Sequence, residues 1–479
     1  MKRALILLVL APVPTMAASR VQTPISLPPT AAGNAPASVL TAPIAPDGGG
    51  TEQILPGTGV PQAWWTMLGS PTLDTLVARA LVANNDIATA DAALRQSQEL
   101  GRAAGAGQFP QVDAGYQVQR VKAGNVLSPP LANPNATLYT LHTAQVNVSY
   151  TLDVFGGVGA KARSARAATE AQRWRTKAAR TTVVANLVQA VVQNAALSEQ
   201  IAAAREAIAA NREILDLIHR RVTFGAAGAA DVAAQDTALA AAEATLPPLE
   251  RAQKHQQALI AIFIGIAPGN PLPPLPALDD LTLPAQLPLS LPSDLVAHRP
   301  DVRAAGAAME GAGADARAAL AARLPSFVLT ANAGGAANQF ADMFATGNPF
   351  WALLGGVTAP VFHAGGLLHQ HHAAQAALDA AKSQYRAAVL QAFSDVSDAL
   401  TALRTDADIW QAAARGDRAS AQSLTFARRQ YELGTMGTYA LLPVTAARAQ
   451  ARATLVQARA ARLSDVVALY QALGGEADK

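Results

Sequence analysis

The chain has 479 residues, no cysteine, a formal net charge of +3 and only 15% charged residues. This length accommodates two or three ordinary domains. The near-neutral charge and the lack of a basic block give no sign of a nucleic-acid partner. The lack of cysteine excludes disulfides, thiolate metal sites and a lipid-accepting thiol at a processed N-terminus.

The first eighteen residues, 1–18, are typical of a secretory signal peptide. Lys2 and Arg3 precede an apolar run over residues 4–9, and small residues follow at the expected cleavage site. A single membrane anchor is the alternative, but the run is too short to span a bilayer. No later stretch reaches eighteen apolar residues, so any membrane-spanning part must consist of strands. Residues 19–63, rich in Pro, Ala, Gly and Thr, are expected to be extended.

A helix is predicted from about Leu73 to Ala106, ended by Phe109–Pro110, and the hydrophobic period then changes. From Ala144 to Val154 the even positions are apolar or small and the odd positions are polar. Such alternation predicts a strand with one apolar and one polar face, long enough to cross a bilayer when tilted. The stretch Val112–Val118 repeats the pattern and predicts a hairpin. A half-buried soluble sheet would produce the same alternation, so this alternative stays open.

The segment Ala160–Phe224 contains no glycine or proline over 65 residues. As a helix it would be roughly 97 Å long. Its second half carries a seven-residue apolar repeat, which requires a partner helix. The repeat positions are Leu187, Asn194, Ile201, Ile208, Leu215 and Val222, with Ala190, Leu197, Ala204, Asn211 and Ile218 three residues further on. A turn at Phe224–Gly228 leads to a returning helix from about Ala229 to Phe263, which Pro247–Pro248 should kink or break. A structural coiled-coil spacer is the simplest interpretation of this stretch alone.

The second half of the chain repeats the first. We divide it into a first repeat, 64–265, a proline-rich linker, 266–292, and a second repeat, 293–475. Each repeat is predicted to run helix, two strands, long helix, turn, long helix; the second-repeat strands are expected around Phe327–Ala333 and Pro349–Pro360. Matching landmarks lie at nearly constant spacing: Asp86 with Asp301, Pro110 with Pro325, Val154 with Val361, Gly225 with Gly434, and Gly265 with Gly474. Four strands cannot close a membrane barrel, so several copies would have to share one.

Particular motifs make the chain resemble the TolC-like outer-membrane efflux channels, in the NodT-type branch that serves RND-type (proton-driven) tripartite exporters. The resemblance extends from Trp64 to Gly475. The motifs that carry it are Trp64–Gly69, Asn84–Ile87, Phe109–Pro110, Leu295–Arg303 and Val467–Gly475.

This resemblance implies an α+β fold in which a homotrimer shares a twelve-stranded transmembrane barrel, four strands per chain. A periplasmic α-helical barrel of about 100 Å would continue it. It implies residence in the outer membrane, in contact with its lipid, and two protein partners: a periplasmic adaptor and an inner-membrane RND-type transporter. The expected function is passive export of small molecules or drugs, with no cofactor and no nucleic acid. A trimeric coiled-coil structural or surface protein is the alternative. An enzyme is not expected, because no acid–base pair, nucleophile or metal constellation is evident.

The resemblance also assigns candidate functional residues near the two helix turns. Tyr439, Leu442 and Pro443 match the constriction, although Pro443 replaces the aspartate usual in the family and Ala446 replaces an arginine. Asp231 and Tyr431 match a tether that keeps the tip closed; an ordinary helix cap and a tyrosine packed between helices are the alternatives. The adaptor-docking turns correspond to Phe224, Gly225, Ala226, Leu433, Gly434 and Thr435.

Three further groups each have a functional and a structural interpretation. His363, His369, His371 and His372 could ligate a metal but more simply form a solvated helix start, so no metal site is predicted. Gly156–Lys161 superficially resembles a phosphate loop but lacks the second glycine and the Ser or Thr that follows the lysine. Asp395 and Asp398 could line a duct, although a solvated helix face is simpler.

Overall fold

The computed structural model describes residues 41–43, 51–56, 61, 63–122, 138–289 and 299–475. The predicted signal peptide, 1–18, lies outside the described residues, as do most of 19–63 and the start of the Leu295–Arg303 motif. The strands are β1 (Thr41–Pro43), β2 (Thr51–Pro56), β3 (Gln111–Lys122), β4 (Leu138–Leu152), β5 (Gln286–Leu289), β6 (Ser326–Ala337) and β7 (Pro349–Thr358). The α-helices are α1 (Pro71–Ala83), α2 (Asn85–Ala106), α3 (Gly157–Thr223), α4 (Ala229–Phe263), α6 (Pro300–Ala321), α7 (Gly366–Glu432) and α8 (Thr438–Ala472), and the short 3₁₀ helices are η1 (Trp64–Leu68), η2 (Leu278–Asp280) and η3 (Phe340–Asp342).

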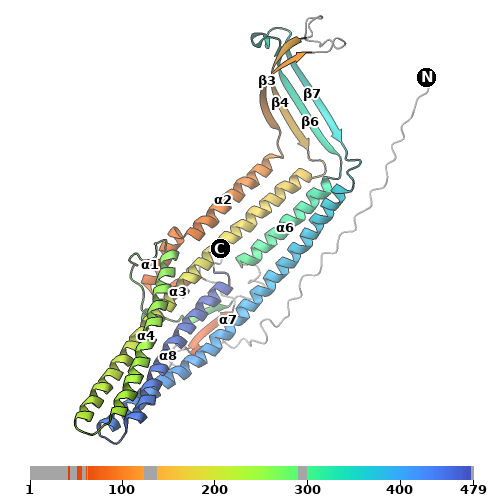
Figure 1. The fold of residues 1–479 in the computed structure, drawn as a ribbon. Helices are drawn as coiled ribbons and strands as arrows, with labels where there is room; N and C mark the ends of the chain where they lie inside the picture. Colours follow the sequence, from red (N-terminus) through yellow and green to blue (C-terminus); the bar gives the residue numbers. More distant parts are fainter. Residues whose placement is uncertain are drawn as a thin grey trace. The chain divides into compact units, whose positions relative to one another are not determined.

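A four-stranded antiparallel sheet has the order β3-β4-β6-β7. Within the described residues β3 and β7 are its two open edges. The helices that lead into and out of these strands lie in the same order, because α2 packs on α3, α3 on α6, and α6 on α7. Figure 1 shows this row of helices continuing into the four strands.

The sheet register separates two chemically different faces. On β4 the even positions from Ala144 to Leu152 share a face with Val112–Val118 of β3 at its even positions and with Phe327–Ala333 of β6 at its odd positions. Over these ranges the intervening polar residues, such as Asp113, Asn147 and Asn332, lie on the opposite face. The predicted alternation is therefore confirmed for three strands. As expected, β7 is apolar on both faces, with Trp351 and Leu353 on one and Phe350 and Leu354 on the other.

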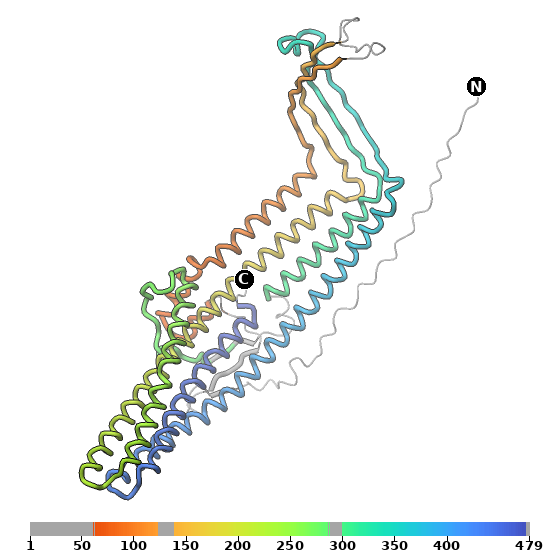
Figure 2. Tube along the Cα trace, viewed as in Figure 1, coloured from red at the N-terminus to blue at the C-terminus, as the bar shows by residue number. Residues whose placement is uncertain are grey.

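The two long helices α3 and α7 each contain 67 residues. Each is followed by a turn and a 35-residue returning helix, α4 or α8, which packs back along it. The predicted repeat order is thus present in both halves. Figure 2 shows that α3 and α8, although distant in sequence, also lie side by side. None of the described helices is both long and apolar enough to span a membrane.

Asn84 divides the first predicted helix, Leu73–Ala106, into α1 and α2, so the expectation of one continuous helix was wrong. Its backbone is extended, and its side-chain oxygen accepts hydrogen bonds from the amides of Asp86 and Ile87 at the start of α2. Its side-chain nitrogen donates to the carbonyl of Phe263 at the end of α4. Asn84 therefore caps one helix and ties it to the end of another.

Pro247 and Pro248 do not break α4, which is one helix over Ala229–Phe263. The heptad packing predicted for the second half of α3 is confirmed from Leu187 to Ile208, since Leu187, Asn194, Ile201 and Ile208 are buried. Close to the turn the buried stripe shifts by one residue to Ile214, and Val222 is 37% exposed.

Arg299 joins the start of the second repeat to the end of the chain. Its guanidinium is nearly buried and donates to both carboxylate oxygens of Asp301, to Asp395 of α7, and to the carbonyl of Ala472. Burial acts to raise the pKa of Asp301, but the hydrogen bonds and charge of Arg299 outweigh it and leave that pKa lowered. Asp395 is therefore one arm of an ion-pair network, and its interpretation as part of a solvated helix face was incomplete.

Other parts that were predicted as independent segments are also connected. β1 and β2, within the predicted extended segment 19–63, form a small sheet with β5 from the predicted linker 266–292. Trp64 is buried and stacks on Tyr470 near the end of α8, with ring centroids 5.2 Å apart. The first and last motifs of the resemblance thus pack against each other.

Candidate functional site

The two turns that end α3 and α7 have the same backbone construction. Gly225 and Gly434 both adopt positive φ, +70° and +74°. The amide of Ala226 donates to the carbonyl of Arg221, and the amide of Thr435 donates to that of Gln430. These are the bonds of a glycine-terminated helix, in which a left-handed residue allows the chain to reverse. We call the two turns, 224–228 and 433–437, with the adjoining helix ends, the tip.

Each turn presents one large apolar side chain to solvent. Phe224 is 86% exposed and Leu433 is 66% exposed. They occupy equivalent positions, each directly before the left-handed glycine. Space around both glycines is open, so those glycines are required by their backbone conformation and not by a close neighbour.

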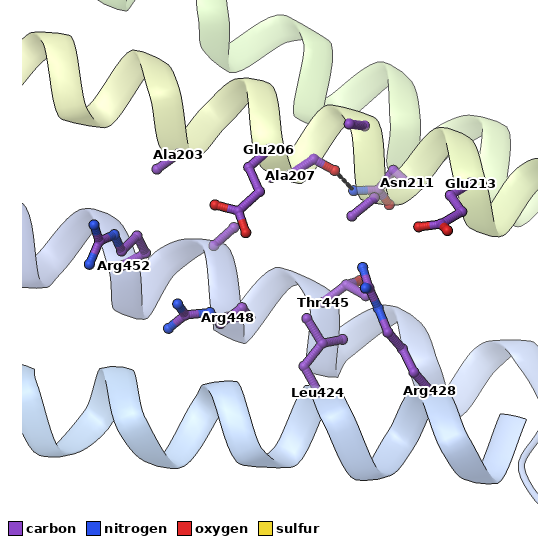
Figure 3. Close-up of a pocket in the computed structure, with 13 residues that line it drawn as sticks. Ala203, Glu206, Ala207, Asn211, Glu213, Leu424, Arg428, Thr445, Arg448 and Arg452 are labelled. Carbon is purple, nitrogen blue, oxygen red and sulfur yellow. Dashed lines mark hydrogen bonds between the residues drawn. The ribbon is translucent and has the colours of Figure 1, made fainter.

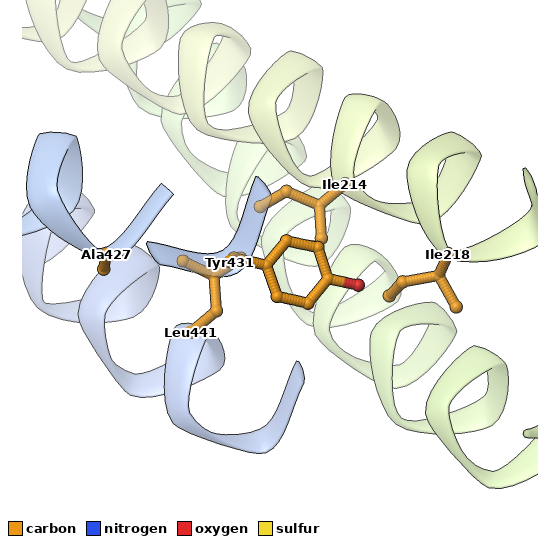
Figure 4. Close-up of a cluster of buried hydrophobic side chains, with 5 residues drawn as sticks. All are labelled: Ile214, Ile218, Ala427, Tyr431 and Leu441. Carbon is orange, nitrogen blue, oxygen red and sulfur yellow. The ribbon is translucent and has the colours of Figure 1, made fainter. Parts of the chain in front are cut away.

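Tyr431 anchors the core of the tip (Figure 4). Its ring is buried against Ile214 and Ile218 of α3 and Leu441 of α8. The Arg221 guanidinium lies over the ring, 4.2 Å from its centroid, and donates to the Tyr431 carbonyl. This cluster joins the α3–α4 hairpin to the α7–α8 hairpin within one chain.

The predicted tether residues do not contact each other within one chain. Asp231 accepts a hydrogen bond from the amide of Gly228, 2.9 Å away, and so caps α4. The Tyr431 hydroxyl lies 3.4 Å from the Thr438 hydroxyl. These are the cap and the packed tyrosine that were considered as alternatives, and a contact between neighbouring subunits stays a prediction.

The three predicted constriction residues lie together on one stripe of α8. Tyr439 is 63% exposed, Pro443 is exposed, and Leu442 between them is half-buried. Spacings of three and four residues place them on neighbouring positions of one helix face. The opposite face carries Leu441 and Thr445, which are buried against the rest of the tip. Within one chain this stripe is therefore free to face a neighbour or a duct.

A charged cavity separates the two hairpins a few turns from the tip (Figure 3). Its volume is about 460 Å³. Glu206 and Glu213, seven residues apart on α3, line it opposite Arg428 of α7 and Arg452 of α8. Within the described part of the chain none of these four side chains forms an ion pair with another. The sequence interpretation missed this site, although the seven-residue spacing of the two glutamates beside a coiled-coil stripe was a usable signal.

Different polar contacts hold each hairpin together beside this cavity. In the first hairpin, the buried side chain of Gln235 donates to the carbonyl and side-chain oxygens of Asn211, at 2.9 and 3.0 Å. In the second, Arg448 pairs with Asp417 at 2.5 Å and also donates to its carbonyl. The two hairpins therefore resemble each other more closely in backbone structure than in the side-chain contacts that hold them together.

The remaining candidate groups have structural roles or show no ligand geometry. Asp153 accepts hydrogen bonds from the amides of Val158 and Gly159, so the glycine-rich Gly156–Lys161 stretch starts α3. His371 is 7% exposed, which corrects the expectation of a wholly solvated histidine group. Among the described residues, no group of three or more His, Cys, Asp or Glu side chains is placed to hold a metal.

Comparison with known proteins agrees with this geometry. The family model described as outer membrane efflux protein matches residues 76–265 and 291–475. The chain is 31% identical over 417 residues to the pyoverdine export outer membrane protein OpmQ of Pseudomonas putida, covering 86% of this chain and 88% of that one. It is 27% identical to the toluene efflux pump outer membrane protein TtgC of Pseudomonas putida, covering 86% and 85%.

Solved structures show the same fold. The outer-membrane channel OprN superposes with a TM-score of 0.82 at 24% identity, covering 88% of this chain and 93% of that chain. The outer membrane protein VceC of Vibrio cholerae superposes with a TM-score of 0.78 at 23% identity, covering 86% and 98%. The resemblance inferred from the sequence motifs is confirmed, and the comparisons give no support to a coiled-coil surface protein. The chain belongs to the family of outer membrane efflux proteins and is an outer-membrane efflux channel with a large periplasmic helical part.

Proposed function

We propose that three copies of this chain assemble into the exit duct of a tripartite pump and export small organic molecules passively. The observation that carries the proposal is the open four-stranded sheet, in which β3, β4 and β6 have one apolar and one polar face. An open edge cannot face lipid, because its backbone groups would lack partners. β3 of one chain pairing with β7 of the next removes both edges, and the apolar face then meets lipid while the polar face lines water.

The number three comes from the family, and the sheet itself requires only more than one chain. Three sheets of four strands form a barrel with twelve strands, within the range known for such pores. The paired helices below would then enclose the periplasmic part of the duct. No group in the chain is assigned a catalytic task, and the energy for transport comes from the inner-membrane partner.

Closure of the duct is proposed to occur at the stripe Tyr439, Leu442 and Pro443. An aspartate ring would favour cations, whereas this ring is apolar and would close by steric fit and by excluding water. Weak charge selectivity is therefore expected. Opening would separate the second hairpin from the first at the Tyr431 cluster, and the charged cavity beside it leaves space for that movement. The Asp231–Tyr431 contact between subunits would oppose such opening.

Docking of the periplasmic adaptor is proposed at Phe224–Ala226 and Leu433–Thr435. The exposed Phe224 and Leu433 would supply apolar contacts, and the equivalent backbone of both turns would allow two similar docking positions per chain.

The experiment that tests the duct is reconstitution of the purified protein in planar bilayers. We expect stepwise conductance from heat-labile trimers, with a reversal potential close to zero in a salt gradient. Conductance with strong cation preference that survives neutralisation of Asp231 would contradict the apolar constriction. Protein that remains monomeric and forms no pore would contradict the proposed function as a whole.

A further inference from the structure

The lysine and arginine residues of the four-stranded sheet are confined to one place. Among the residues of β3, β4, β6 and β7, the only ones are Arg120 and Lys122. Both occupy even positions of β3 and so share the apolar face with Val112 and Val118. Both lie at the end of β3 that is far from the helices. We call these two residues the basic rim.

An aromatic group lies directly below the basic rim on the same face. Tyr116 and His142 are diagonal neighbours across β3 and β4, and the tyrosine hydroxyl is 2.7 Å from His142 Nδ1. Phe340 of η3 packs edge-on against both rings, with centroids 5.7 and 6.4 Å away. Tyr116 and Phe340 are nevertheless more than half exposed. Rings of this kind are typical of the level where hydrocarbon gives way to headgroups.

The basic rim carries unbalanced positive charge. Arg120 donates to the Thr140 hydroxyl at 3.0 Å, and neither Arg120 nor Lys122 pairs with a carboxylate of the described residues. Asp342 of η3 is the acidic side chain in the adjoining β6–β7 connection, and Asp113 lies on the polar face towards the helices. The connection over residues 123–137 contains no charged residue in its sequence.

The apolar face of β3 leads from the helix end of the sheet to the basic rim. From Val112 to Val118 the apolar face extends for roughly 20 Å at about 3.3 Å per residue. Arg120 is the next residue on the same face, at the end of β3 opposite the helices. Since the helices lie in the periplasm, this end of the apolar face reaches the outer leaflet.

We propose that the basic rim binds the headgroup of a phosphate-bearing outer-leaflet lipid, whose acyl chains lie along the apolar face over Tyr116 and Val118. Arg120 and Lys122 supply the positive charge, and guanidinium groups suit phosphate oxygens particularly well. The inference rests on the proposed function, because it requires the apolar face of the sheet to meet lipid.

The test titrates the purified full-length trimer in detergent with lipid A that carries two phosphates, and measures retained lipid by native mass spectrometry. The Arg120→Gln/Lys122→Gln variant should bind about twenty-five times more weakly, at roughly fivefold per basic residue. Binding should also weaken with salt. The matched control neutralises two exposed cations of α4, Arg251→Gln/Lys254→Gln, and should bind as the parent does. The charge-conserving variant Arg120→Lys/Lys122→Arg should retain most binding.

Each other outcome overturns the inference. Equal lipid A retention by the parent and the rim variant, both trimeric on unheated gels, excludes a rim site. Equal retention of dephosphorylated and bisphosphorylated lipid A excludes phosphate recognition. Displacement of lipid A by millimolar inorganic phosphate alone would assign the site to free phosphate. The conductance of the same preparations is recorded separately. Absence of a pore would count against the proposed function, whereas lipid A retention would still test the basic rim as a binding site.

Discussion

Replacement of Arg299 by glutamine should open the junction between the second repeat and the C-terminal helix. The substitution keeps similar bulk but removes the charge that Asp301 and Asp395 share, along with the hydrogen bond to the Ala472 carbonyl. A buried carbonyl without a donor costs about 1–3 kcal/mol. The two carboxylates are 43% and 33% exposed, so solvent screening limits each loss to about 0.5 kcal/mol. The expected total is about 2–4 kcal/mol.

Hydrogen–deuterium exchange measures this loss where it occurs. A local opening free energy lowered by about 2–4 kcal/mol accelerates amide exchange roughly thirty- to several-hundred-fold. The acceleration should concentrate at the start of α6 and the end of α8. Arg102→Gln is the matched control, because it breaks an ion pair to Glu99 whose side chains are 74% and 68% exposed. It should change exchange in α2 by less than about fivefold. Equal effects of the two substitutions would refute the reasoning.

The same network has a definite pH dependence. The folded-state pKa of Asp301 is lowered, so its contribution is fully present above its ordinary value of 3.8 and is lost as pH falls through the lower folded value. Between neutral pH and about pH 3, the parent should therefore lose more stability than Arg299→Gln, as measured by exchange at the same amides. A larger acid-induced loss in the variant would reverse the expected sign.

Three further predictions concern the tip and its supports. Pro443→Asp should restore an acidic ring at the constriction and shift the reversal potential towards cation selectivity; an unchanged potential would place Pro443 away from the narrowest point. Phe224→Asp and Leu433→Asp should leave trimers and conductance intact but weaken adaptor binding at least tenfold, as measured by pull-down or interferometry. Unaltered binding would exclude the turns as docking sites. Gly265→Ala should destabilise the protein more than Gly225→Ala, because only at Gly265 would a new Cβ lie 2.6 Å from a backbone oxygen. Both glycines have positive φ, so the backbone strain of about 1–2 kcal/mol is common to both variants. Equal denaturation midpoints of the two variants would contradict the expected difference.

Periodicity predicted the backbone architecture well because each element buries a chemically distinct face. Strict alternation over Ala144–Val154 identified β4, although that strand ends at Leu152 and begins earlier, at Leu138. The absence of glycine and proline over Ala160–Phe224 identified α3 almost to its ends. Both elements depend on residues that are near each other in sequence, so the local pattern is sufficient to predict them.

Features that depend on distant residues were not predictable from local pattern. Asn84 interrupts a helical pattern because its partner is the end of α4, 179 residues away. Arg299 stood out only as part of a motif, and its carboxylate and carbonyl partners come from three separate elements. Pro247 and Pro248 were expected to kink or break α4, and the helix does not break but continues through both.

The candidate functional residues of the tip lie in and beside the two turns, but the roles proposed for them depend on neighbouring chains. Tyr439 and Pro443 lie on one exposed stripe of α8. The stripe can form a ring only when several chains assemble. The residue pattern of one chain does not predict that assembly. The resemblance to a family supplied this information, and for that reason the tether, the constriction and the docking turns stand as proposals.

The central claim is that neighbouring chains pair β3 with β7 to close one barrel, and a cysteine cross-linking measurement tests it most directly. The natural chain contains no cysteine, so introduced pairs react without background. Gln117→Cys on β3 is combined in turn with Ala352→Cys, Leu354→Cys or Gly356→Cys on the corresponding face of β7. At least one pair should come within disulfide reach and produce covalent trimers, and no larger species, on heated non-reducing gels. Exclusively monomeric protein from every pair, in membranes where each variant still exports substrate, would contradict the shared barrel.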